Sequence, residues 1–261
     1  MQSLSTLKIQ YLSDLHIDVW KKVPYEIVKS GDILVLAGDI GNIRIPIVQQ
    51  FYKEISNKFN DIVLIYGNHE YYQNLYSEIC TMDQYEEETK NFILNFPNIH
   101  LLQKETWVHS TGIEFYGCTL WDNIPEDFEE DISQTFNDFF QIFLPSKERF
   151  SIKQENIVFA DHFKWLEEQI SKGKACVVVT HHVPFNKHLL DHILNDRFDL
   201  TKVKFFESLI KPNVKLWICG HMHTERLVNV NNIPIVLNAI GYPKQRYKVN
   251  LNKTYDIIYS L

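Results

Sequence analysis

The stretch DILVLAGD, from Asp32 to Asp39, decides the fold class, because five apolar residues in succession lead into a glycine and an aspartate. An apolar run of this length is typical of a β-strand that is buried on both faces, as in a sheet covered by helices. Similar runs recur along the chain at 7–14, 61–68, 175–182, 214–221 and 233–241.

Segments with the spacing of amphipathic helices alternate with these strands. In 155–172 the apolar residues fall on one helical face, and Gly173 is placed to end that helix. Further helices are expected at 45–59, 83–96 and 201–211, and hairpins at 107–122 and 246–261, turning at 110–112 and near Asn252. Strands that alternate with helices predict a layered α/β architecture.

Length and composition limit the class of protein. The 261 residues, 45% of them hydrophobic, suit a single domain, 1–261, with a packed core. A net charge of -7 disfavours a nucleic-acid-binding protein. The four scattered cysteines predict free thiols in a reducing compartment, and neither a leader peptide nor a membrane-spanning run is visible. We therefore expect a cytoplasmic protein that does not contact a membrane.

The region 123–154, called the excursion below, interrupts the alternation of strands and helices. It is acidic and carries Phe128, Phe136, Phe139, Phe140 and Phe143. We interpret it as part of the single domain that passes over one edge of the core. It either caps the active site or simply packs against the core, and its helical spacing suits both alternatives.

The predicted strands end in the same few residue types. The five ends present Asp14 and His16, Asp39, Asn68 and His69, His181 and His182, and His221 and His223. Ligands of open α/β sheets bind outside the carboxyl ends of the strands. Imidazole, amide and carboxylate groups without a thiolate suit first-row divalent ions. The donors are too numerous for one ion, so they favour two ions about 3.5–4 Å apart that share a carboxylate.

Each pattern alone has a simpler explanation. Asp-x-His after a strand is usually an ordinary turn, Gly-Asp often caps a helix, and His-His can be one core and one exposed residue. The order of the patterns, each at the end of a strand, makes coincidence a poor explanation. The sequence therefore favours a metal site.

These patterns together resemble the calcineurin-like metallophosphoesterase superfamily. The resemblance rests on Asp-x-His at 14–16, Gly-Asp at 38–39, Gly-Asn-His-Glu at 67–70, one His at 181 or 182, Gly-His-x-His at 220–223, and Asn-x-x-Gly-Tyr-Pro at 238–243, as in small bacterial-type members. It implies a four-layer α/β/β/α sandwich, in which two mixed β-sheets are flanked by helices and the active site lies above them.

The resemblance also implies the ligands of two divalent ions (Mn, Fe, Zn or Co). One ion would be held by Asp14, His16, Asp39 and His223, and the second by Asp39, Asn68, His181 and His221, with Asp39 bridging. We choose His181 over His182 because it stands first at the strand end. His182 would then contact the phosphate or support a ligand.

Three further residues have expected roles at this site. His69 would act as general acid or stabilise charge on the phosphoryl group, and Glu70 would orient its imidazole. Arg44 could bind the phosphate in bidentate fashion, although a solvated charge at the start of a helix explains it as well.

The expected activity is hydrolysis of a phosphate ester by in-line attack of a hydroxide that bridges the two ions, with Asp39 and His69 as the catalytic residues. We expect a small phosphomonoester as substrate. A phosphodiesterase or nuclease using the same site is the alternative, although net acidity disfavours long nucleic acid. A non-catalytic interaction scaffold is a third possibility, and the complete set of ligand positions argues against it.

Overall fold

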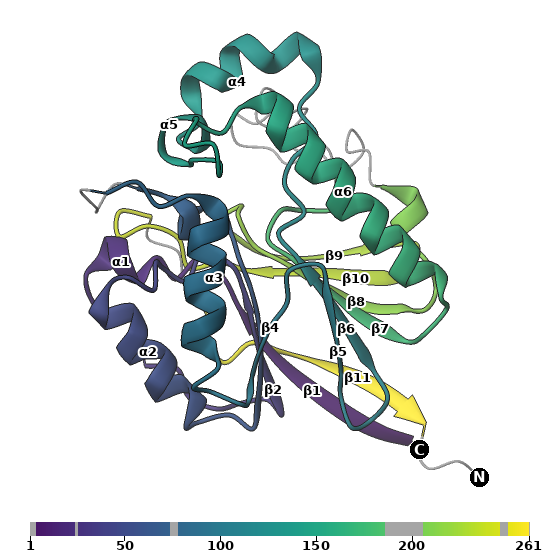
Figure 1. Cartoon of the computed structure of the whole chain (residues 1–261). Coiled ribbons are helices and arrows are strands. Elements are labelled where there is room, and N and C mark those ends of the chain that lie inside the picture. Colours follow the sequence, from purple (N-terminus) through teal and green to yellow (C-terminus); the bar gives the residue numbers. More distant parts are fainter. Residues whose placement is uncertain (1–3, 24–25, 74–77, 186–205, 246–249, 261) are drawn as a thin grey trace.

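The computed structural model describes residues 4–23, 26–73, 78–185, 206–245 and 250–260. Two β-sheets pack face to face, and helices cover the outer face of each sheet (Figure 1). The predicted four-layer α/β/β/α sandwich with two mixed sheets is confirmed.

The first sheet has the strand order β11-β1-β2-β3-β4. Its strands are β1 (Leu4–Leu12), β2 (Ile33–Ala37), β3 (Asp61–Ile65), β4 (Ile99–Leu101) and β11 (Thr254–Ser260). The first four are parallel, and β11 runs antiparallel to β1 at the edge. The expected turn before β11 is present, with Lys253 N donating to Asn250 O at 3.2 Å, while 246–249 lie outside the described residues.

The second sheet has the strand order β5-β6-β7-β8-β10-β9. Its strands are β5 (Glu105–Val108), β6 (Glu114–Cys118), β7 (Cys176–Thr180), β8 (Val214–Cys219), β9 (Glu225–Val230) and β10 (Ile233–Asn238). The four central strands are parallel, and β5 and β9 are antiparallel edges. The expected hairpin is β5–β6, and it turns through Gly112 at φ +82°.

Helices α1 (Ile17–Trp20), α2 (Pro46–Ser56) and α3 (Met82–Ile93) lie with the first sheet, and α6 (Ile152–Ser171) lies over the second (Figure 1). Helix α6 begins three residues before the expected position because Ser151 caps it. Of the helix expected at 201–211, the part through 205 lies outside the described residues, and the rest holds the 3₁₀ turn η4 (Glu207–Leu209). No helix in the described ranges combines the length and apolar character needed to span a bilayer.

The apolar run within 32–39 forms β2, and its two faces pack into two different hydrophobic cores. Ile33, Val35 and Ala37 face the opposite sheet, whereas Leu34 and Leu36 pack beneath the helices. Side chains alternate between the two faces of a strand, so burial on both faces requires apolar residues throughout.

The two sheets are joined where their strands end. Ser13, after β1, forms a parallel bridge with Ala239, after β10. Ser13 N donates to Asn238 O, and Ile240 N donates to Ser13 O, both at 3.1 Å. These bonds bring the carboxyl ends of the parallel strands of both sheets to one place.

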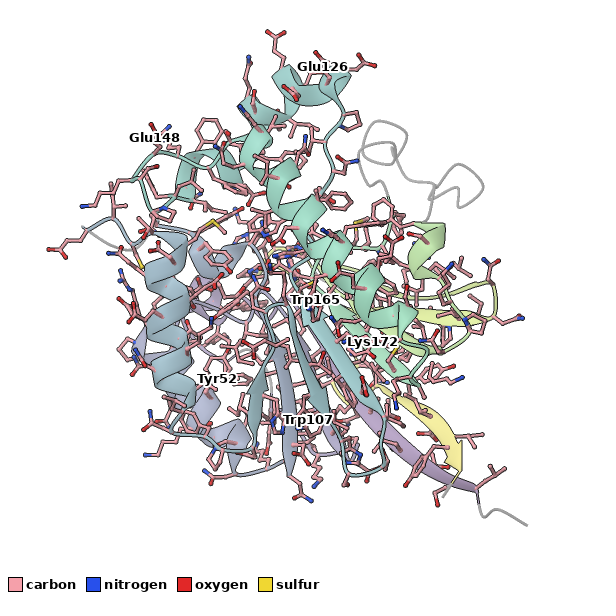
Figure 2. All side chains as sticks on the ribbon, turned by 45° about the vertical axis from the view of Figure 1, so that its right-hand side comes forward. Tyr52, Trp107, Glu126, Glu148, Trp165 and Lys172 are labelled. Atoms are coloured by element: carbon pink, nitrogen blue, oxygen red, sulfur yellow. The ribbon has the colours of Figure 1, made fainter. Side chains whose placement is uncertain are left out.

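The excursion lies above these strand ends in Figure 1 and contains η2 (Glu126–Phe128), α4 (Glu129–Thr135) and α5 (Asp138–Gln141). Its Glu126 and Trp107 of β5 lie at opposite ends of the molecule (Figure 2). Three side chains of α6 hold the backbone that leads into the excursion: His162 Nδ1 accepts from Leu120 N, Glu155 Oε1 from Asp122 N, and Asn156 Oδ1 from Ile124 N.

Candidate metal centre

The backbone adopts the left-handed conformation just after three of the ligand-bearing strands, β1, β2 and β8. Five candidate ligands adopt the left-handed conformation: Asp14 (φ 54°), His16 (42°), Asp39 (55°), His221 (66°) and His223 (43°). A non-glycine residue in this region costs about 1–3 kcal/mol, and such residues cluster at functional sites. Five of the seven residues that the sequence assigned to metal binding therefore carry this strain, whereas Asn68 and His181 do not.

The first cluster joins the ends of β1, β2 and β8. Asp14, His16, Asp39 and His223 each offer a donor atom within 4.8 Å of all the others. His223 Nε2 lies 3.3 Å from Asp14 Oδ1, and His16 Nε2 lies 3.7 Å from Asp39 Oδ2. Donors that bind one zinc ion at 2.0–2.2 Å stand at most about 4.4 Å apart, so these two distances suit a single ion.

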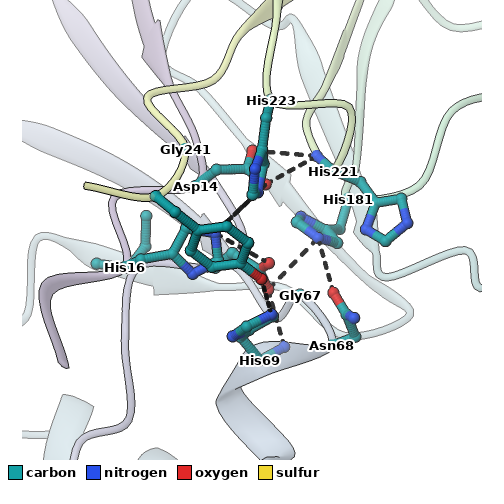
Figure 3. A network of polar contacts seen from close by, with 12 residues as sticks. Asp14, His16, Gly67, Asn68, His69, His181, His221, His223 and Gly241 are labelled. Carbon is teal, nitrogen blue, oxygen red and sulfur yellow. Dashed lines mark hydrogen bonds and ion pairs between the residues drawn. The ribbon is translucent and has the colours of Figure 1, made fainter. Parts of the chain in front are cut away.

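The second cluster joins the ends of β2, β3, β7 and β8 (Figure 3). His181 Nε2 lies 3.2 Å from Asn68 Oδ1 and 3.4 Å from Asp39 Oδ1. The rings of His181 and His221 are 5.2 Å apart between centroids. Asp39, Asn68 and His221, which the sequence assigned to the second ion, thus lie around His181. His182 belongs to this group as well, because His181, His182 and His221 each offer a donor atom within 4.8 Å of the others.

Charge in the two clusters is balanced between buried carboxylates and imidazoles. Burial alone would raise the pKa of Asp39, but the imidazoles of His181 and His69 hold it well below its usual value. Burial opposes a charge on His181 as well, yet the Asp39 carboxylate raises the pKa of this imidazole to about 10. Burial lowers the pKa of His16 to about 3, which leaves that ring neutral and able to ligate. Buried carboxylates that need positive charge, beside neutral imidazole, fit divalent cations.

Two glycines allow the ligands to approach one another this closely. A Cβ atom on Gly67 would lie 2.1 Å from Asp39 Oδ1 and 2.8 Å from His181 Cε1. A Cβ atom on Gly38 would lie 2.5 Å from His181 Nδ1, and its φ of +84° also favours glycine. Any larger residue would occupy the space that the donors share.

Two histidines are oriented by an acceptor behind the ring. His181 Nδ1 lies 2.9 Å from Ala37 O, and His223 Nδ1 lies 2.6 Å from Gln245 Oε1. The acceptor holds a proton on each Nδ1, so Nε2 is the nitrogen that would ligate a cation once its own proton is displaced. No pattern in the sequence pointed to Gln245, which belongs to the loop after β10.

Glu70 has a different role from the expected one. Its Oε2 accepts from the backbone N–H groups of Asp39 (3.0 Å) and Gly67 (2.7 Å), and its Oε1 accepts from Ile40 N (2.7 Å) and Gly41 N (3.2 Å). The carboxylate therefore ties the loop after β2 to the loop after β3. The expectation that it orients the His69 imidazole does not hold, because backbone donors occupy both oxygens.

His69 faces the open side of the clusters. Its backbone N–H donates to Asp39 Oδ1 at 2.9 Å, and its Nε2 lies 2.6 Å from the hydroxyl of Tyr242. The ring of Tyr72 lies 4.1 Å from the imidazole ring between centroids. The sequence marked Tyr242 only as part of a family-like stretch and assigned it no role.

A cavity of about 320 Å³ lies in front of the clusters. Strand ends and the loop after β10 supply one side: Asp39, Asn68, His69, Tyr72, His221, His223 and Tyr242. The excursion supplies the other side with Thr135, Phe136, Asn137 and Asp138. Asp138 is buried and accepts from Asn68 Nδ2 at 2.8 Å.

Two residues expected to bind substrate are not placed at this cavity. His182 is 1% exposed, stacks on His221 at 4.1 Å between ring centroids, and has its Nδ1 3.2 Å from Asp122 Oδ2. Arg44 forms a bidentate contact with Glu88 of α3, at 2.6 and 2.7 Å. Neither residue lines the cavity. His182 instead lies behind His221, within donor distance of His181 and His221, and Arg44 forms an ion pair with α3.

Comparisons with known proteins agree with this arrangement. The family model of the calcineurin-like phosphoesterases matches residues 7–225. A protein of Acanthamoeba polyphaga mimivirus, described as uncharacterized, is 31% identical over 279 residues, which cover 95% of this chain and 96% of that protein.

Solved structures share the fold at low sequence identity. The phosphopantetheinyl hydrolase of Mycobacterium tuberculosis superposes with a TM-score of 0.69 at 17% identity, covering 97% of this chain and 95% of its own. A protein of Thermus thermophilus superposes with a TM-score of 0.53 at 14% identity, covering 97% and 98%. With the match of the family model over most of its length, the chain belongs to the calcineurin-like phosphoesterase family and is a metal-dependent phosphoester hydrolase.

Proposed function

We propose that the chain hydrolyses a small phosphomonoester at a dinuclear metal centre. The observation that carries this proposal is the carboxylate of Asp39, whose Oδ2 faces His16 at 3.7 Å while its Oδ1 faces His181 at 3.4 Å. Its two oxygens thus belong to different clusters, as expected of a bridging ligand. One ion would be held by Asp14, His16, Asp39 and His223, and the other by Asp39, Asn68, His181 and His221.

The residues around the ions have distinct roles in this proposal. Two divalent ions would supply a nucleophilic water at neutral pH and neutralise charge at phosphorus. His69 lines the cavity beside them, and a proton on its Nε2 would pass to the leaving oxygen. The Tyr242 hydroxyl, 2.6 Å from this atom, would hold the ring in position until a substrate replaces that contact.

The size of the cavity and the charge of the chain around it favour a small substrate over a polymer. Its volume is about 320 Å³, and residues of the excursion form part of its wall. Helix α4 begins with Glu129, Glu130 and Asp131, and the net charge of the chain is -7. These charges would repel a long polyanion. We also infer a single domain in which the excursion caps the site, and a cytoplasmic location that keeps the four free cysteines reduced.

The first experiment is metal-dependent hydrolysis by chelator-treated protein. An aryl phosphomonoester and a bis-aryl phosphodiester would each be assayed with added Mn, Fe, Zn or Co. We expect two bound ions per chain and metal-restored hydrolysis of the monoester. Preference for the diester would replace our substrate class with the phosphodiesterase alternative, and failure to bind metal would refute the dinuclear centre.

The role of His69 can be separated from metal binding. We expect His69→Ala to retain both ions but to lose about 10²–10⁴-fold in kcat, which is the usual contribution of general acid catalysis. Metal content by elemental analysis and steady-state kinetics measure the two properties independently. His109→Ala, in the β5–β6 turn, is the matched control and should resemble the wild type. Loss of metal from His69→Ala would contradict the assigned role.

A further inference from the structure

Asp138 belongs to the excursion, yet it contacts a candidate metal ligand. It is the first residue of α5 and is 3% exposed. Its Oδ1 accepts from Asn68 Nδ2 and from the Tyr72 hydroxyl, both at 2.8 Å. Asn68 Nδ2 also lies 3.1 Å from the Tyr72 hydroxyl. These three side chains form a closed triangle of hydrogen bonds at the cavity wall.

This triangle determines which end of the Asn68 amide faces the second cluster. An asparagine side chain has an NH₂ group that only donates and an oxygen that only accepts. Because Asp138 Oδ1 is an acceptor, it selects the NH₂ group. The amide oxygen is thereby turned toward His181, whose Nε2 lies 3.2 Å away (Figure 3). The reversed amide would present N–H groups to the cluster, and these cannot bind a cation.

We propose that Asp138 is a positioning residue for the second ion, acting through the amide of Asn68. The inference rests on the proposed dinuclear function and assigns the excursion a part in building the metal site. The end of β3 supplies the ligand Asn68, and Asp138 of the excursion fixes the orientation of its amide. Residues that orient a metal ligand typically contribute about 10–100-fold to metal affinity.

The test compares Mn²⁺ binding by the wild type, Asp138→Ala and Asp138→Asn, measured by competition with a chelator. We expect Asp138→Ala to bind one ion as the wild type does and the other about 10–100-fold more weakly. Asp138→Asn keeps an oxygen that can accept from Asn68, so it should bind both ions nearly as well as the wild type. Asp131→Ala, which removes another acidic side chain from the excursion, is the control for charge and should bind both ions normally.

Activity gives a second readout that distinguishes positioning from general damage. Hydrolysis by Asp138→Ala should recover as Mn²⁺ is raised to saturate the weakened site, whereas a misfolded cavity would not recover. If Asp138→Ala fails to fold, Asp138→Ser takes its place, because the serine hydroxyl is too short to reach Asn68.

Two outcomes would overturn the inference, and they have different consequences. If the wild type binds two ions and Asp138→Ala binds both equally well, the positioning role alone is wrong. If the wild type at saturating Mn²⁺ binds fewer than two ions, the proposed dinuclear function fails together with the inference.

Discussion

The strand ends and the excursion face the same cavity, but they hold their side chains in different ways. Asp14 and Asp39 follow parallel strands whose neighbours on both sides fix the backbone, and both adopt left-handed conformations. The excursion reaches the cavity on α4 and α5, which have seven and four residues. Rigid sheet ends suit groups that must stay in place during the reaction, whereas short helices can differ between relatives without disturbing the sheets.

The largest effect is expected at the strand ends. Asp39→Asn removes the charge that faces both clusters, so both ions should bind poorly and hydrolysis should fall by more than the roughly 100-fold that a supporting residue contributes. Metal content and kcat would be measured together with the unfolding midpoint. Asp61→Asn is the matched control, because Asp61 begins β3 at the end of the strand that lies away from the clusters. An active Asp39→Asn enzyme would contradict the bridging role.

A smaller effect is expected from the carboxylate that joins two strand ends. Glu70→Gln replaces one acceptor oxygen with an NH₂ group among four backbone donors. The loop that carries Asp39 should loosen, with about 10–100-fold loss of metal affinity and about 1–3 kcal/mol loss of stability. Chelator competition and denaturant unfolding measure these two quantities. Unchanged metal binding would show that the sheets alone hold Asp39 in place.

The excursion should affect substrate binding more than turnover. Phe136→Ala removes apolar surface from the cavity wall. A loss of about 1 kcal/mol in the binding free energy of an aryl phosphate would raise its KM about fivefold, with kcat retained. Phe140→Ala is the matched control, because this phenylalanine lies in α5, is 43% exposed and does not line the cavity. A Phe136→Ala variant with an unchanged KM would favour packing over capping as the role of this wall.

The same contrast explains what could be predicted from the sequence. The strands were recognisable because burial on both faces requires continuous apolar runs, and the candidate ligands follow these runs directly. Asp138 was not recognisable, since no pattern in its surroundings indicates that α5 returns to the end of β3. The ion pair between Arg44 and Glu88 was not recognisable either, because Glu88 comes from a helix that lies far away in the sequence.

Helix α6 holds the start of the excursion through a histidine that allows a test by pH. His162 Nδ1 accepts from Leu120 N at 3.1 Å, and burial lowers the pKa of His162 from 6.5 to about 3. Below pH 6.5 this histidine is protonated in the unfolded chain but stays neutral in the folded chain. As the pH falls below 6.5, this histidine should therefore lower the free energy of unfolding by about 1.4 kcal/mol per pH unit. The decrease ends near pH 3, where the folded state is protonated as well.

His162→Asn isolates this contribution, because the asparagine oxygen can accept from Leu120 N but does not titrate. Denaturant unfolding between pH 7.5 and pH 5 should show the variant losing less stability than the wild type as the pH falls, while hydrolysis at pH 7.5 is unchanged. Equal slopes would mean that water reaches His162 in the folded state. The backbone at the start of the excursion would then be more exposed to water than the strand ends are. The difference between the two regions would in that case hold next to the second sheet as well as at the cavity wall.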